Sequence, residues 1–175
     1  SLWIRQRRQG HWYRDFAPIY EAIEYAAGFN QTLNELQLAM NSVAEGVQRY
    51  SQAWFKVDQF YRKFIYYAQQ SGQASLLKPL SEHIENRYTN SYLLKLGDQF
   101  AGLVDGLETW DGSPIVKQSQ FFAHWVQPFL RKDKKVVVIV SDALRYEVCE
   151  ELLTLIRQED RYGAELSPML SMLPS

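Results

Sequence analysis

Ser141 and Asp142 directly follow a run of five β-branched residues, Val136 to Val140, and precede a helical pattern. In open α/β sheets, ligands bind outside the carboxyl ends of the strands. A carboxylate at such a place can hold a divalent cation, because hard and borderline cations accept Asp oxygen readily. Asp142 is therefore a candidate metal ligand, whereas Ser141 fits the turn better than the chemistry.

A helix N-cap is the competing role for Asp142, and the pattern by itself favours it, since Asp caps helices well. Arg145 shifts the weight toward a functional role. If Asp142 caps the helix, Arg145 falls in the first turn, where a cation opposes the helix dipole at a cost of a few tenths to about 1 kcal/mol. Locally unfavourable choices of this kind are often found at functional sites.

The elements around these residues predict a βαβ unit. The run at 136–140 does not alternate with polar residues, which is typical of a parallel strand buried on both faces. A helix is expected over residues 143–157 and a second extended segment over residues 164–173. We therefore expect parallel strands near 136–141 and 163–172, joined by a right-handed crossover.

The residues before this unit predict helices almost throughout 1–130. Apolar residues at alternating steps of four and three predict a helix from Val43 to Ala68, roughly 40 Å long, ending at Gly72. Its expected partner is a helix at 32–41. Gly28 is expected to stop the first helix.

A second helical pair and a connecting segment follow, and they set the expected domain boundaries. The pair is expected at 79–87, with Pro79 in the first turn, and at 92–107. A short helix from Ser119 to Val126 is expected to close at Pro128. The predicted domains are a helical region (1–112), a connecting helix and turn (113–135) and a truncated βαβ part (136–175).

The composition of the chain argues against several classes of protein. The 175 residues are 46% apolar with a net charge of −1, so no global charge draws the chain to nucleic acid or an anionic membrane. Cys149 is the single cysteine, which excludes an internal disulfide and fits a reducing compartment. No apolar run approaches the roughly 20 residues of a membrane span.

Two further sets of residues have candidate roles. Basic residues among aromatic ones near the start form a candidate phosphate-binding cluster, but a solvated helix face is the commoner explanation for such a pattern. This cluster comprises Arg5, Arg7, Arg8 and Arg14. The three histidines, His11, His83 and His124, share no metal-ligand spacing.

The chain resembles the PglZ family. The segment Val136 to Glu147, VVVIVSDALRYE, is similar to the PglZ domain signature, and so is the segment Leu166 to Ser175. The segments Trp54 to Ile65 and Trp125 to Leu130 resemble the helical region that precedes this domain in type A members.

The resemblance implies an alkaline-phosphatase-superfamily domain, a doubly wound α/β fold with two divalent metals, commonly zinc. Asp142 matches the metal-ligand Asp at the end of the first strand, and Arg145 is a candidate anion contact. The nucleophile is expected just beyond Ser175, and the remaining Asp and His ligands further on. The chain is then expected to be an internal part of a longer protein and inactive by itself.

The implied activity is metal-assisted phosphoester hydrolysis, in which two metals about 4 Å apart stabilise the attacking and leaving oxygens. The resemblance also implies a cytoplasmic component of a bacterial BREX phage-defence system, with methyltransferase and ATPase partners and DNA or nucleotide phosphoesters as candidate substrates. Two alternatives remain open at this point. One is a non-catalytic protein-interaction module, and the other is a helical nucleic-acid-binding protein with salt-dependent affinity.

Overall fold

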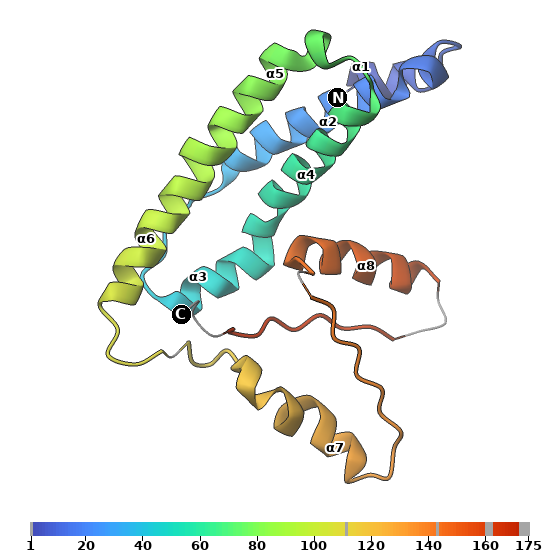
Figure 1. Cartoon of the computed structure of the whole chain (residues 1–175). Helices are drawn as coiled ribbons and strands as arrows, with labels where there is room; N and C mark the ends of the chain where they lie inside the picture. Colours follow the sequence, from blue (N-terminus) through green and yellow to red (C-terminus); the bar gives the residue numbers. More distant parts are fainter. Residues whose placement is uncertain (1, 111, 143, 160–162, 172–175) are drawn as a thin grey trace. The chain divides into compact units, whose positions relative to one another are not determined.

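The computed structural model describes residues 2–110, 112–142, 144–159 and 163–171 (Figure 1). The described residues fall into two compact units. Residues 1–39 and 53–99 form the first unit, and residues 40–52 and 100–175 form the second. None of the described helices is long and apolar enough to cross a membrane.

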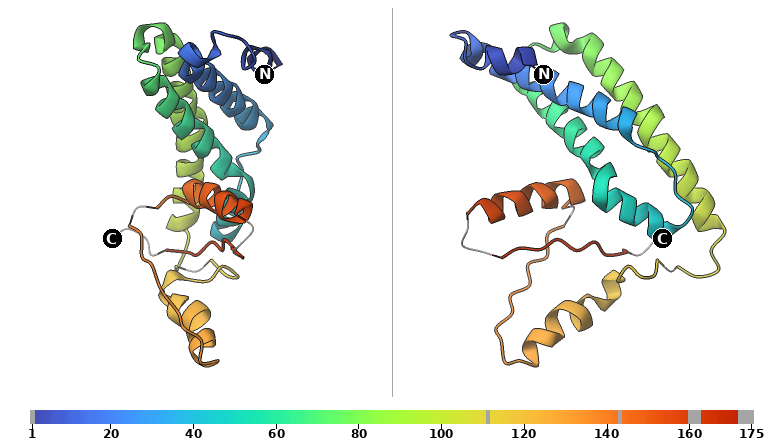
Figure 2. Two further views of the ribbon diagram at one scale, coloured as in Figure 1. Left: turned by 90° about the vertical axis from the view of Figure 1, so that its right-hand side faces the viewer. Right: turned by 180° about the vertical axis from the view of Figure 1, so that it is seen from behind.

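The first unit is an antiparallel arrangement of long helices. Figures 1 and 2 show α2, α4 and α5 running alternately up and down, with α2 and α4 side by side. Its elements are α1 (Leu2–Arg7), α2 (Tyr13–Glu35), α4 (Phe55–Gln70), α5 (Ala74–Asn86), the π-helical turn η2 (Arg87–Leu93) and the first part of α6 (Leu94–Asp105).

Side chains from α2, α4 and α5 pack together in one apolar core. The fully or almost fully buried apolar residues of this unit are Ile4, Ala22, Ala26, Phe29, Leu33, Trp54, Phe55, Val57, Phe64, Leu77, Ile84 and Tyr92. Those of α2 recur at three- and four-residue steps, as an amphipathic helix requires. Aromatic residues thus serve the helical core, in agreement with their spacing in the sequence.

Gly28 does not end the first helix, and that prediction is wrong. Helix α2 continues to Glu35, so α2 itself, and not a helix at 32–41, is the partner of α4. The physical reason is close packing, because a Cβ atom on Gly28 would lie 2.6 Å from Cε1 of Phe60 on α4. The glycine makes room for the neighbouring helix.

The helix predicted from Val43 to Ala68 is present in three parts. Helix α3 (Val43–Arg49) leads into a π-helical turn, η1 (Tyr50–Trp54), and then into α4. Ser42 caps the amino terminus, since its side chain accepts a hydrogen bond from the Glu45 N–H at 3.1 Å. The predicted end at Gly72 is confirmed, and its φ of 61° is a conformation that glycine adopts without strain.

The helix boundaries predicted around the two prolines are wrong. Helix α5 begins at Ala74, so Pro79 lies inside it, and α5, η2 and α6 follow one another without a break. Pro128 does not close a helix but lies in the first turn of α7 (Gln127–Leu130), which follows η4 (Phe122–Val126) directly.

The second unit has shorter helices and more irregular chain. Besides residues 43–52, it contains η3 (Gln118–Gln120), η4 (Phe122–Val126), α7 and α8 (Tyr146–Gln158). The short helix expected from Ser119 is present, although its first residue is Gln118 and Lys117 is the N-cap.

The two predicted strands are not formed among the described residues of 136–142 and 163–171. The one strand-like pairing described is a parallel bridge between Lys117 and Leu170, with the Leu170 N–H donating to the Val116 carbonyl at 2.9 Å. Residues 136–140 run as irregular chain, and Ile139 and Val140 are 88% and 89% exposed. A parallel strand needs a neighbour for its hydrogen bonds and helices over its faces, and the described residues supply no ladder partner for this exposed segment.

Candidate functional site

Asp142 lies at the end of the exposed irregular segment that precedes α8, and its side chain is exposed. Helix α8 begins at Tyr146 and its N-cap is Arg145, with φ −74° and ψ 149°. The Arg145 carbonyl accepts the first hydrogen bonds, from the Val148 and Cys149 N–H groups at 3.1 Å each. Asp142 is therefore three residues too early to cap the helix.

The prediction that Arg145 lies in the first turn of the helix is wrong. Arg145 is exposed and lies at the cap, outside the helical turns. The acidic residue of the first turn is Glu147, where a negative charge suits the positive end of the helix dipole. The supposed conflict between Arg145 and the dipole is not present in this structure.

The surroundings of Asp142 decide whether its carboxylate could bind a metal alone or with other ligands. An exposed carboxylate that does not cap a helix has the right chemistry for one bond to a divalent cation. A complete site needs several ligands, and among the described residues no three His, Cys, Asp or Glu side chains come together. Asp142 is thus a single candidate ligand, with no such group of three around it among the described residues.

The histidines do not add to the candidate ligand. His124 lies against the ring of Trp125, with ring centroids 4.4 Å apart, as expected of a packing residue. His11 makes an edge contact with Trp12 at 5.4 Å.

Tyr146 is the residue next to the candidate site that sequence reasoning missed. Its hydroxyl lies 3.2 Å from the Ser51 carbonyl oxygen and 3.3 Å from Oε1 of Glu150. Its ring meets that of Tyr50 edge-on, at 5.9 Å between centroids. Burial raises the pKa of Tyr146, and the nearby Glu150 carboxylate raises it further, so the phenol stays protonated and able to donate.

Glu147 was also missed, and its side chain is only 1% exposed. A buried carboxylate is uncommon, and in the sequence it looks like one more polar residue in a helix. Burial also raises the pKa of the Cys149 thiol, and the charge of Glu147 adds to that effect. The first turn of α8 is thus more closely packed than its polar sequence indicates.

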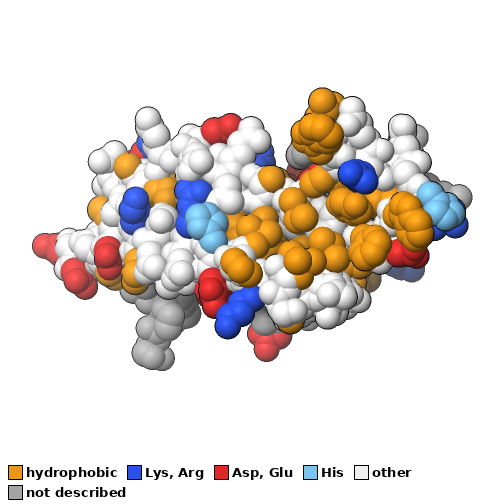
Figure 3. Space-filling view, turned by 90° about the horizontal axis from the view of Figure 1, so that it is seen from above, with side chains coloured by type: hydrophobic (Ala, Val, Ile, Leu, Met, Phe, Trp, Pro, Cys, Tyr) orange, Lys and Arg blue, Asp and Glu red, His pale blue; other side chains and the backbone are white. Residues whose placement is uncertain are grey.

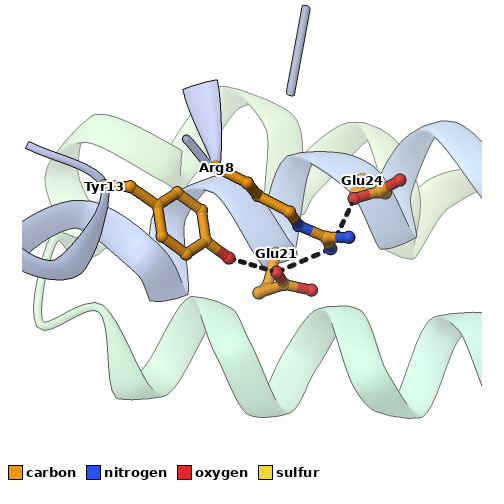
Figure 4. A network of polar contacts seen from close by, with 4 residues as sticks. All are labelled: Arg8, Tyr13, Glu21 and Glu24. Atoms are coloured by element: carbon orange, nitrogen blue, oxygen red, sulfur yellow. Dashed lines mark hydrogen bonds and ion pairs between the residues drawn. The ribbon is translucent and has the colours of Figure 1, made fainter. Parts of the chain in front are cut away.

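The basic cluster near the start is partly neutralised. Figure 4 shows Nη2 of Arg8 between two carboxylates of α2, at 2.7 Å from Glu21 and 2.8 Å from Glu24. The Tyr13 hydroxyl donates to the same Glu21 at 2.6 Å. Arg7 and Arg14 are exposed, and the side chain of Arg5 lies outside the described part of the structure. Arg8 therefore holds α1 to α2 and is engaged by acidic groups of its own chain.

The face drawn in Figure 3 is rich in exposed apolar side chains. Figure 3 shows hydrophobic side chains gathered over a broad area of one face, with Lys and Arg side chains scattered among them. Exposed apolar residues of the first unit include Leu2, Trp3 and Trp12, which are 71%, 75% and 66% exposed. Proteins that bind nucleic acid usually gather basic residues into a patch or stripe.

Comparison with known proteins gives a family. The family model described as the BREX system PglZ alkaline phosphatase-like domain matches residues 121–175, which include Asp142 and Arg145. An alkaline phosphatase-like protein PglZ of Bacillus cereus (strain H3081.97) is 32% identical over 98% of the chain. The chain belongs to the PglZ family.

A second PglZ-family relative supports the same assignment. The alkaline phosphatase-like protein BrxZ of Escherichia coli O9:H4 (strain HS) is 39% identical over 72% of the chain. The chain spans 21% of the length of the Bacillus relative and 15% of that of the Escherichia relative. No solved structure matches the chain.

Proposed function

We propose that this PglZ-family chain carries the first metal-ligand segment of a metal-dependent phosphoesterase that works in a BREX phage-defence system. The observation that carries the proposal is the position of Asp142. It lies inside the residues matched by the alkaline phosphatase-like family model, its side chain is exposed, and it does not cap α8. A carboxylate in that state remains available for a cation.

Asp142 would supply one oxygen ligand to a divalent cation, and we propose zinc. The chemistry that such a cation supplies when bound is stabilisation of charge on phosphoester oxygens. Arg145 lies three residues further on and is exposed, so its guanidinium is available to bind phosphate oxygens. The other ligands and the nucleophile would lie in the four fifths of the Bacillus relative that this chain does not span. We expect no turnover from the 175 residues alone.

The exposed run before Asp142 supports the finer fold proposal. Three of its side chains, Val137, Ile139 and Val140, are 85–89% exposed, a large apolar area for a segment that pairs with none of the described residues. In the longer protein we propose that this run becomes a strand of the doubly wound sheet, with α8 as its crossover helix. The cytoplasm, other proteins of the defence system as partners, and DNA or nucleotide phosphoesters as substrates belong to the same proposal.

The test uses the full-length protein and the Asp142→Asn variant. An amide is a poor ligand for a divalent cation, so metal content and phosphoesterase rate are both expected to fall strongly. Asp133→Asn is a matched control, because Asp133 is an exposed carboxylate in the preceding loop with a φ of 53°, which Asn tolerates well. Wild-type metal content and rate in Asp142→Asn would contradict the assignment of this residue.

The protein-interaction module is the second candidate, and the exposed apolar residues of the first unit favour it. Trp3 and Trp12 are 75% and 66% exposed, and aromatic side chains are enriched where proteins bind one another. If this is the main function, Trp3→Ala and Trp12→Ala should release partner proteins in a pull-down while the full-length protein shows neither metal nor turnover. Binding of partners that is unchanged in both variants would contradict it.

A further inference from the structure

We propose that Tyr146 is a positioning residue, which fixes the loop that carries Asp142 by anchoring the start of α8 to the π-helical turn η1. The functional meaning of this anchor rests on the proposed role of Asp142. The anchor itself depends only on contacts within the second unit. It joins Ser51, in the helical region, to Tyr146, which lies 95 positions later in the segment that the family model matches.

Two contacts of Tyr146 make the anchor. The hydroxyl donates to the Ser51 carbonyl at 3.2 Å, and the ring meets the Tyr50 ring edge-on at 5.9 Å with an angle of 65° between planes. An edge-to-face aromatic pair fixes orientation as well as distance. The residue is thus held by its tip and by its ring to two successive residues of η1.

The acceptor of the Tyr146 hydrogen bond is a backbone carbonyl of a π-helical turn. Ser51 lies inside a π-helical turn, and such turns interrupt the regular hydrogen-bond ladder of a helix. Short π-helical turns inside α-helices are frequent at functional sites, where they adapt the helix to a neighbouring group. The Ser51 carbonyl accepts a hydrogen bond from Tyr146, which lies far along the chain in α8. The π-helical turn therefore makes a specific polar contact in addition to its packing.

The position of Tyr146 makes it relevant to the candidate ligand. It is the first residue of α8 and lies four positions after Asp142. The helix starts at the Arg145 carbonyl, and Glu147 in the same turn is 1% exposed. The start of α8, four residues after Asp142, is therefore held at a fixed place, which limits how far the Asp142 carboxylate can move.

Glu150 offers a competing explanation, in which the Tyr146 hydroxyl serves only its own helix. A phenol has a single proton, and Glu150 Oε1 at 3.3 Å is a second acceptor for it. Glu150→Ala removes this acceptor and leaves the Ser51 carbonyl in place. The two explanations therefore predict different results for the same variant.

Hydrogen exchange in the 175-residue chain tests the anchor. Tyr146→Phe keeps the ring contact and removes the hydroxyl, so the hydrogen-bonded amides at the start of α8, those of residues 148–150, are expected to exchange roughly two- to tenfold faster, the factor that one net hydrogen bond gives. Glu150→Ala and Thr154→Val should leave these rates near wild type. Thr154→Val is the matched control, because it removes a hydroxyl whose bond to the Glu150 carbonyl stays within α8.

Two results would overturn the anchor. One is unchanged exchange in Tyr146→Phe, and the other is equal acceleration in Tyr146→Phe and Thr154→Val, which would indicate general fraying of α8. In the full-length protein, a positioning role predicts that Tyr146→Phe lowers metal affinity by up to about tenfold, the low end of what loss of a group bonded directly to a metal ligand costs, because Tyr146 acts on Asp142 only through the start of α8.

The full-length measurement also separates this inference from the proposed function. If Asp142→Asn loses metal and Tyr146→Phe binds it as wild type does, the positioning role is wrong and the proposed function stands. If Asp142→Asn keeps its metal, the proposed function fails, and the positioning role fails with it, whatever the exchange rates show.

Discussion

Gly28 of α2 lies directly against the ring of Phe60 on α4. A Cβ atom on Gly28 would come within 2.6, 2.9 and 3.0 Å of three ring carbons. Such distances are below van der Waals contact, so the two helix backbones approach as closely as they do because residue 28 has no side chain. Gly28 therefore sets the distance between helices α2 and α4.

Gly28→Ala should therefore destabilise the chain although Ala is the better helix former. Alanine gains up to about 1 kcal/mol in propensity, while forcing a methyl group into a packed interface costs typically 1–3 kcal/mol. The matched control is Gly97→Ala in α6, since a Cβ there meets nothing within 4 Å. Urea denaturation should show a loss of stability for Gly28→Ala and a gain of roughly 0.5–1 kcal/mol for Gly97→Ala. A gain in both would show that α2 and α4 are not in close contact.

Tyr61 predicts an alkaline loss of stability. Burial, followed by the hydrogen bond that its hydroxyl donates to Glu85 and the charge of Glu85, raises its pKa from 10.0 to about 12. The folded state keeps this proton to a higher pH than the unfolded chain. The stabilisation is complete below about pH 10 and is lost as the pH rises toward about 12.

Tyr61→Phe isolates this contribution, because it keeps the ring that stacks on Tyr88 at 3.7 Å between centroids. The free energy of unfolding, measured by urea denaturation from pH 9 to pH 12 (roughly the range in which tyrosine titrates), should fall less steeply in this variant than in wild type. Tyr66→Phe removes an exposed hydroxyl and should follow the wild-type curve. Identical slopes for wild type and Tyr61→Phe would contradict the prediction.

The sequence predicts what depends on near neighbours and misses what depends on distant ones. The helix through Val43 and Ala68 is readable because apolar spacing is a local signal, and the stop at Gly72 agrees with its positive φ. Gly28 shows the limit, since a glycine that ends a helix and one that admits a neighbouring helix look alike until Phe60 is known to face it.

The same limit applies to the strand and the site. The β-branched run at 136–140 has strand chemistry, but a strand also needs a partner in the ladder, and the described residues provide none. Asp142 is found from its type and position, whereas the bond from Tyr146 to Ser51 crosses 95 residues and has no local signature. The helix expected from residue 143 begins at Tyr146, because the exact end of a helix has a weaker signal in the sequence than the helix itself.

Ile139→Lys should reduce association of the 175-residue chain without destabilising it. Ile139 is 88% exposed in an apolar run that has no ladder partner in the described part of the chain, and a lysine at an unpaired edge discourages pairing between chains. Light scattering against concentration should show less association, with the free energy of unfolding within about 0.5 kcal/mol of wild type. Ile139→Val is the control and should associate as wild type does. A loss of about 2 kcal/mol or more in Ile139→Lys would mean that this side chain is buried in solution.

Asp142→Ala and Ser42→Ala separate a capping role from an available carboxylate. Ser42 is an N-cap, with its side chain accepting from the Glu45 N–H at 3.1 Å, so its replacement by Ala should cost about 1 kcal/mol. Asp142 lies three residues before the N-cap of α8 and is exposed, so Asp142→Ala should stay within about 0.5 kcal/mol of wild type.

Both positions lie in the second unit, so one urea denaturation experiment followed by circular dichroism compares them directly. An equal loss in the two variants would show that Asp142 caps α8 in solution and would remove the observation on which the metal-ligand proposal rests. Ser42→Asp completes the set, because Asp caps a helix about as well as Ser and should restore the stability that Ala loses. If Ser42→Ala costs stability, Ser42→Asp restores it and Asp142→Ala changes nothing, the carboxylate of Asp142 has no part in holding the helix and is available to bind a cation.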